Sequence, residues 1–300
     1  MFLYSHPQTA GSLLTVVGCL SLTVNLFILY KVIYDKVFIR SCKSFGRIWI
    51  CRGFAYVSLG AFFAFFVPVL CFHDVELLKT RWARSFAHMM MFFTVFEIYS
   101  NFLIAINRYV IISRPLQYSY VFCGTKTLLM ILAVFLIALG CDILNVIDPC
   151  HQTPLDSDMS FVQLPYGCSL WINVFDLVIP FLPLTMTIVI DLMAIHSIRA
   201  SVGVRKTLTT TQPSARKELR LCCMILVQAV ISVYVFLSLS FAAFLENDFL
   251  EFLASTFTWA LVQVVDGLVV ILFNTEMRSG LKKVTSNSSS KAIVDSEASL

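Results

Sequence analysis

The stretch LIAINRYVIISRPLQYSYVF, residues 103–122, is apolar at first and becomes polar at Asn107, Arg108 and Tyr109. With the apolar residues that precede it, it is long enough for a helix to cross a bilayer, whose hydrocarbon core is about 30 Å thick and needs roughly 20 residues. An arginine is costly inside lipid. We therefore expect a membrane-spanning helix that reaches the membrane surface at Arg108.

The composition extends this expectation to the whole chain. Of its 300 residues, 58% are hydrophobic and 13% are charged, whereas a soluble protein has about 25% charged residues. This deficit favours an integral membrane protein. The 10 cysteines form no CxxC pair, so neither a zinc cluster nor a redox motif is predicted. No metal, cofactor or nucleic-acid partner is expected.

Seven apolar segments of sufficient length follow one another along the chain. In lipid every backbone polar group needs an internal partner, so each segment should be a helix, and the alternation typical of a membrane β-barrel is absent from the sequence. The sequence therefore predicts an all-α, seven-transmembrane helix bundle embedded in a lipid bilayer. The expected spans cover residues 11–32, 46–72, 86–108, 125–147, 170–195, 220–244 and 250–273.

Positive charge is distributed unevenly between the loops. Most of the 22 lysine and arginine residues lie after spans 1, 3 and 5 and in the C-terminal tail, whereas the other loops are rich in acidic residues. Cytoplasmic loops carry the excess of basic residues. The N-terminus should therefore lie outside and the C-terminus in the cytoplasm.

The predicted organisation has four parts. Residues 1–10 form a short extracellular N-terminus, and residues 11–274 form the seven-helix domain. Residues 275–284 place apolar side chains on one helical face, which is typical of a short amphipathic helix lying along the membrane. Residues 285–300 are polar and are expected to be a disordered cytoplasmic tail.

Several charged residues fall inside the expected spans, where such residues tend to be paired and functional. Arg52 lies at a depth similar to Glu97 and Asp266, so we predict that Arg52 pairs with one or both in the bundle core. The pair is either a fixed tie between helices or a polar switch whose partners change between two states. Asn25 should donate an interhelical hydrogen bond. Asp191, near the inner end of span 5, is expected to face water.

Short motifs occur in a characteristic order along this framework. They are Asn25, Phe45-Gly46 at the start of span 2, Asn107-Arg108-Tyr109 followed by Pro115, Tyr118 and Phe122, the spaced Cys150 and Cys168, and Asp266-Gly267 followed by Phe273-Asn274. With the seven-helix topology, this combination resembles the rhodopsin-like G-protein-coupled receptors. It is more closely similar to the nematode chemosensory receptors called serpentine receptor class x, over the chain from about residue 11 to 283.

The resemblance implies a plasma-membrane receptor that senses an external small-molecule or peptide ligand and signals to a heterotrimeric G protein. Arg108, flanked by Asn107 and Tyr109, matches the arginine at the inner end of span 3 that governs coupling; a simple membrane anchor is the alternative. Many relatives have an acid where this chain has Asn107. We therefore predict that Glu218, just before span 6, restrains Arg108 in the resting state.

The receptor hypothesis also places a ligand cleft between the outer halves of spans 3, 5, 6 and 7. Anchoring at the membrane interface is the alternative role for each aromatic candidate. Span 7 contains no lysine, so a retinal Schiff base of the opsin kind is not expected there. The candidate lining residues are Phe92, Phe96, Trp171, Asp176, Tyr234 and Trp259.

A disulfide is expected on the outer side, because extracellular loops are oxidising. Cys150 and Cys168 are the first candidates, and Cys71 with either of them is the alternative. The sequence does not decide the pairing.

A transporter that moves ions or protons along the buried carboxylates is the main rival hypothesis. The odd number of spans and the lack of an internal repeat argue against it. An enzyme is not expected, because the sequence has no HExxH motif, nucleophile elbow or phosphate loop.

Overall fold

The computed structural model describes residues 7–35, 43–72, 81–147, 170–205, 213–242, 244–274 and 277–278. The regular elements in these ranges are all helical. In chain order they are α1 (Pro7–Ile33), α2 (Lys43–Ala61), η1 (Phe62–Phe66), α3 (Val67–Phe72), α5 (Arg81–Ser113), α6 (Pro115–Val121), α7 (Gly124–Ile147), α8 (Leu170–Arg205), α9 (Pro213–Ala242), α10 (Asp248–Phe252), η2 (Leu253–Phe257) and α11 (Thr258–Phe273).

Seven helical segments of the described chain are long and apolar enough to cross a membrane, which confirms the predicted count. The third extends past Arg108 to Ser113, further than the sequence predicts. The segments are Gln8–Ile33, Ser44–Phe72, Ser85–Ser113, Gly124–Ile143, Val178–Ala200, Leu219–Ala242 and Phe249–Phe273.

The second span is one continuous run of α2, η1 and α3. In the π-helical turn η1, the backbone N–H of Val67 donates to the carbonyl of Phe62. Pro68 follows directly; it has no backbone N–H and its ring crowds the turn before it. A π-helical turn is one of the recognised ways in which a helix absorbs such a disturbance, so the span continues through the proline.

The end of the third span is set by a proline rather than by a loss of hydrophobicity. Arg114 has φ −138° and ψ 60°, outside the helical region, because a residue that precedes a proline is disfavoured there. Pro115 then starts α6. The first residue of a helix makes no intrahelical hydrogen bond through its N–H, so a proline costs nothing there. The short α6 contains no buried residue.

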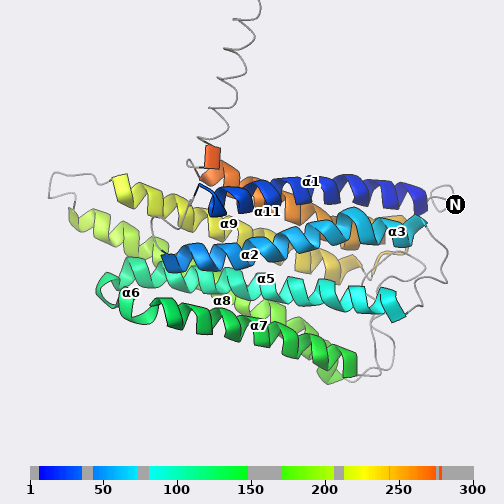
Figure 1. Ribbon diagram of the computed structural model, residues 1–300, viewed down its shortest axis with the longest axis horizontal. Coiled ribbons are helices and arrows are strands. Elements are labelled where there is room, and N and C mark those ends of the chain that lie inside the picture. The colour runs from blue at the N-terminus through cyan, green and yellow to red at the C-terminus, as the bar shows by residue number, and fades with distance from the viewer. Residues whose placement is uncertain are drawn as a thin grey trace, which may run out of the picture.

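The helices form a bundle in which α5 has neighbours on several sides. α5 packs against α2, α7 and α8, while α1 packs against α2 and α11, and α9 against α8 and α11. Figure 1 shows that α1, α5, α8 and α11 run in one direction and α2, α7 and α9 in the other. We call the end where α1 begins the Pro7 end, and the opposite end, where α5 meets α6, the Arg108 end.

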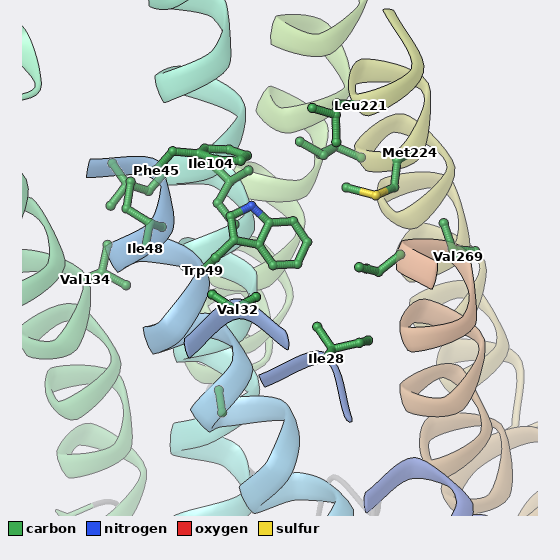
Figure 2. Packing of buried hydrophobic residues seen from close by; sticks show 14 of the residues in the cluster. Ile28, Val32, Phe45, Ile48, Trp49, Ile104, Val134, Leu221, Met224 and Val269 are labelled. Atoms are coloured by element: carbon green, nitrogen blue, oxygen red, sulfur yellow. The ribbon is translucent and has the colours of Figure 1, made fainter. Parts of the chain in front are cut away.

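The largest buried apolar cluster lies toward the Arg108 end and centres on Trp49. Trp49 is 1% exposed, and its ring meets that of Phe45 edge to face at 6.1 Å. Figure 2 shows Trp49 among side chains from several helices, including Ile104 and Met224. Met277, just beyond α11, is buried in the same cluster. This packing fixes the depth at which the nearby polar side chains sit.

The outer surface of the bundle is apolar. Large side chains such as Val16, Leu129, Leu182 and Phe241 are between 57% and 66% exposed. A surface of this kind is unfavourable in water and matches lipid. The fold is therefore that of a multi-pass membrane protein.

Candidate functional site

Arg52 lies in α2 and is buried inside the bundle at 3% exposure. Its Nη2 is 3.6 Å from Oδ2 of Asp266 in α11. The same nitrogen donates to the hydroxyl of Tyr56 at 3.0 Å, and Nε donates to Oδ1 of Asn101 in α5. The Tyr56 hydroxyl in turn donates to Asp266. The guanidinium is thus held by three helices at once.

Two aromatic rings complete the surroundings of this guanidinium. Its central carbon lies 4.6 Å from the ring centroid of Trp49 and 4.3 Å from that of Tyr56. Rings at such distances attract a cation through their negative faces, more strongly when water is excluded. Arg52 therefore has a counter-ion, hydrogen-bond acceptors and two ring faces, as a buried charge requires.

Further hydrogen bonds extend this site across the bundle. Gln263 Nε2 donates to Oε2 of Glu97 at 3.2 Å, and Asn25 Nδ2 donates to the Gln263 carbonyl at 3.2 Å. Gln228 Nε2 donates to the Asp266 carbonyl at 3.3 Å. We call the resulting network the polar core. It comprises Asn25, Arg52, Tyr56, Glu97, Asn101, Gln228, Gln263 and Asp266.

The polar core brings together four of the intramembrane residues singled out in the sequence, namely Asn25, Arg52, Glu97 and Asp266. Arg52 contacts Asp266 directly, whereas Glu97 is hydrogen-bonded to Gln263 in α11. Tyr56 is the member that sequence reasoning missed. Its position one helical turn after Arg52 places both side chains on one face, and a tyrosine at that spacing from a buried charge is the feature that could have revealed it.

Gly267 follows Asp266 for a steric reason. A Cβ at this position would lie 2.4 Å from Cγ1 of Val24 and 3.3 Å from Oδ1 of Asn25, both on α1. Only glycine permits this approach of the two helices. The close packing of α1 on α11 brings Asn25 within reach of the Gln263 carbonyl.

A second group of buried polar residues lies at the Arg108 end. Arg108 is 2% exposed and Asn107 is 1% exposed. Asn107 Nδ2 donates to the Tyr118 hydroxyl of α6 at 3.2 Å. The Tyr118 and Phe122 rings stack at 5.6 Å, and Ser44 Oγ donates to the Phe122 carbonyl at 2.7 Å. These contacts fix α6 against α5 and α2, so Asn107 has a docking role here.

Asp191 in α8 is buried rather than exposed to water, which corrects the expectation from the sequence. Its exposed fraction is 0%, and Ala194, Ile195 and Ile198 on the same helical face belong to a buried cluster. Tyr109, half-buried on α5, packs against that cluster. The position of Asp191 near the end of span 5 predicts a depth near the membrane surface. Depth alone does not tell which way the side chain faces.

The candidate ligand-lining residues have different neighbours in the structure. Phe92 and Phe96 stack on one another at 6.0 Å and both contact Phe135 of α7. Trp259 meets Phe63 of η1 edge to face at 5.6 Å. Tyr234 is 66% exposed, so it faces away from the bundle, contrary to the expectation that it lines a cleft. The side chains of Trp171 and Asp176 lie outside the described residues.

Three other predictions concern parts of the chain that are only partly described. The side chain of Glu218, the proposed restraint on Arg108, lies outside the described residues, as do Cys150 and Cys168. Cys71 is buried as a free thiol, so the alternative disulfide with Cys71 is not formed in this structure. Of residues 275–284, only 277 and 278 are described, and both are helical.

The fold places the protein in a known structural class. The crystal structure of squid rhodopsin matches it with a TM-score of 0.73 at 15% sequence identity, covering 95% of this chain and 87% of that chain. At this identity the similarity concerns the fold alone. The class is that of a rhodopsin-like seven-helix bundle.

The sequence identifies the family within that class. The model of the family described as "Serpentine type 7TM GPCR chemoreceptor Srx" matches residues 13–274, so the chain belongs to this family of serpentine chemoreceptors. "Serpentine receptor class X 45" of Caenorhabditis elegans is 25% identical over 265 residues, which are 80% of this chain and 72% of that protein. Members of this family are G-protein-coupled receptors and not enzymes.

Proposed function

We propose that the protein is a chemosensory receptor of the plasma membrane that binds an external ligand and signals to a cytoplasmic heterotrimeric G protein. Family membership supports the receptor role. The single observation that carries the coupling proposal is the placement of Arg108, which is buried in α5 directly beside the docked helix α6. A positioned arginine at the end of a bundle can be uncovered by a rearrangement and then bind a partner.

The Arg108 end is proposed to face the cytoplasm. The loops that follow α1, α5 and α8, together with the C-terminal tail, carry most of the lysines and arginines. Basic loops are retained on the cytoplasmic side. The Pro7 end then faces outward and meets the ligand.

The short helix α6 is proposed to be part of the G-protein contact surface. Leu116 is 95% exposed and Tyr120 is 74% exposed, and α6 has no buried residue. Exposed apolar side chains on a rigidly held element are typical of an interaction site. The hydrogen bonds from Asn107 to Tyr118 and from Ser44 to Phe122 supply that rigidity.

The polar core is proposed to be the element whose arrangement changes with ligand. A ligand shifts a receptor only if it binds one of two states better, and a discrete set of polar contacts can supply two such states. The contacts between Arg52 and Asp266 and between Glu97 and Gln263 join α11 to α2 and to α5. Movement of α11 relative to these helices would exchange the partners of Arg52.

The ligand is proposed to bind toward the Pro7 end. Both π-helical turns, η1 and η2, lie in that half, and Phe63 of η1 contacts Trp259, the second residue after η2. Such turns occur frequently at functional sites. Trp259 therefore stays among the candidate ligand residues, together with Phe92 and Phe96.

Complex formation with nucleotide-free G proteins tests this function without a known ligand. A G protein that prefers the active receptor stabilises that state reciprocally. We expect the receptor in lipid nanodiscs to retain at least one heterotrimer from a panel of Gα classes after the nucleotide is removed with apyrase. Leu116→Asp should abolish retention with unchanged thermal stability, because Leu116 is 95% exposed. Retention of no heterotrimer, or equal retention by the variant, would contradict the proposal.

A further inference from the structure

Asp191 is a buried carboxylate that lacks hydrogen bonds. Its exposed fraction is 0%, and neither Oδ1 nor Oδ2 has a hydrogen-bond partner among the described residues. A buried charge of this kind is strongly unfavourable unless an opposite charge compensates it. The ionised form of Asp191 is therefore stable at this position only with a positive group nearby.

Two contacts between α5 and α8 show which part of α5 lies beside Asp191. The Tyr99 hydroxyl donates to the carbonyl of Ile179 at 3.3 Å, and Ser113 Oγ donates to Ser197 Oγ at 3.4 Å. Between these contacts the two helices run in the same direction. With a rise of about 1.5 Å per residue, Arg108 lies about 8 Å before Ser113, and Asp191 lies about 9 Å before Ser197. Measured from Tyr99 and Ile179 instead, Arg108 lies about 14 Å and Asp191 about 18 Å further along. The two charged residues are therefore within about one helical turn of each other in depth.

The faces of the two helices agree with this depth. Ala194 and Ile195, about one turn after Asp191, belong to a buried cluster, and Ile112, one turn after Arg108, packs against it. Residues three or four apart lie on one helical face, so Asp191 and Arg108 belong to the faces through which α8 and α5 meet. Arg108 is itself buried at 2% exposure.

We propose that Arg108 and Asp191 form a buried charge pair between α5 and α8 that holds Arg108 in the resting receptor. Asp191 then supplies the negative charge that the sequence lacks at Asn107, from another helix rather than from the adjacent residue. The pair itself follows from burial and register alone. Its restraining role rests on the proposed coupling to a G protein.

A double-mutant cycle on thermal stability tests the pair without any G protein. Asp191→Asn and Arg108→Gln should each lower the melting temperature of the purified receptor by about 5 °C or more, because each removes one member of a buried charge pair. The double variant should lose clearly less than the two losses added together. Additive losses would overturn the pair.

Asp142 of α7 provides a matched control for this cycle. It is an intramembrane aspartate whose Oδ1 lies 3.6 Å from His88 Nδ1 on α5. Arg108→Gln combined with Asp142→Asn should give additive losses, because that aspartate has its own neighbour. Should a single variant fail to fold, Asp191→Glu keeps the charge and should preserve the melting temperature; a loss equal to that of Asp191→Asn would overturn the pair.

Retention of nucleotide-free heterotrimer by the ligand-free receptor tests the restraint. Asp191→Asn should increase the fraction of receptor that retains the heterotrimer several-fold, while Asp142→Asn should leave it unchanged. An increase with Glu218→Gln but not with Asp191→Asn would assign the restraint to Glu218 and overturn this role for Asp191. If the wild type and all variants retain no heterotrimer, the proposed function fails, but the stability cycle still decides whether the pair exists.

Discussion

The contact between Arg52 and Asp266 offers the most quantitative prediction. Both side chains are almost fully buried, and Nη2 of Arg52 lies 3.6 Å from Oδ2 of Asp266. Replacing Arg52 by Gln leaves Asp266 and Glu97 buried without a positive charge and removes two ring contacts. Breaking a buried pair by removing one partner costs about 3–5 kcal/mol. For a chain of this size that corresponds to a fall in melting temperature of roughly 6–20 °C.

The assay is thermal unfolding of the receptor in detergent. The quantity measured is the fraction of receptor that stays monodisperse as the temperature rises. Lys31→Gln is the matched control, because Lys31 pairs at 2.5 Å with Asp35, whose side chain is 46% exposed, and pairs at the surface contribute about 0.2–1 kcal/mol. Adding Asp266→Asn to Arg52→Gln should restore part of the loss, since the uncompensated carboxylate is removed. A small loss on Arg52→Gln, or a double variant whose loss equals the sum of the two single losses, would show that the buried pair does not stabilise the receptor.

Three further predictions concern the helix contacts and α6. Gly267→Ala should destabilise the receptor by about 1–3 kcal/mol, because its Cβ would lie 2.4 Å from Val24, whereas Gly140→Ala, with nothing within 4 Å, should be tolerated in the same melting assay. Leu116→Ala should weaken G-protein binding several-fold in a titration without changing the melting temperature; a lowered melting temperature would show a structural role instead. Tyr118→Phe removes the acceptor of the Asn107 hydrogen bond and should cost about 0.5–1.5 kcal/mol, together with a measurable loss of coupling.

The helical framework was predictable because lipid imposes a simple rule. A run of about 20 apolar residues must form a helix to satisfy its backbone, so hydrophobicity alone gives the seven spans. The ends of helices follow local rules instead. The third span continues past Arg108 to Ser113, and Pro115 stops it.

The depth of the intramembrane charges was predictable, but their direction was not. Counting residues from the span ends places Arg52 and Asp266 at one level, and they meet in the polar core. The same counting places Asp191 near the membrane surface, yet its side chain is buried against its neighbours. Tyr234 shows the converse case, since it lies on a helix of the bundle but faces outward. The direction of a side chain depends on how its helix is rotated about its own axis. That rotation is set by packing against the other helices, so it cannot be read from the sequence of one span.

The network around the charges was the least accessible feature. Glu97 and Asp266 are equivalent candidates as partners of Arg52 in the sequence. The structure separates them, because the Tyr56 hydroxyl and the approach of α1 at Gly267 fix α11 so that Asp266 meets Arg52 and Gln263 meets Glu97. Such choices depend on how several helices pack against one another.

Coupling to a G protein is tested by the retention of nucleotide-free heterotrimer in nanodiscs, compared between wild type, Leu116→Asp and Asp191→Asn. The wild type should retain the heterotrimer with at least one Gα class, Leu116→Asp should retain none, and Asp191→Asn should retain several-fold more. Absence of any retained heterotrimer with a well-folded wild-type receptor, or ion flux through the reconstituted protein in its place, would contradict coupling to a G protein.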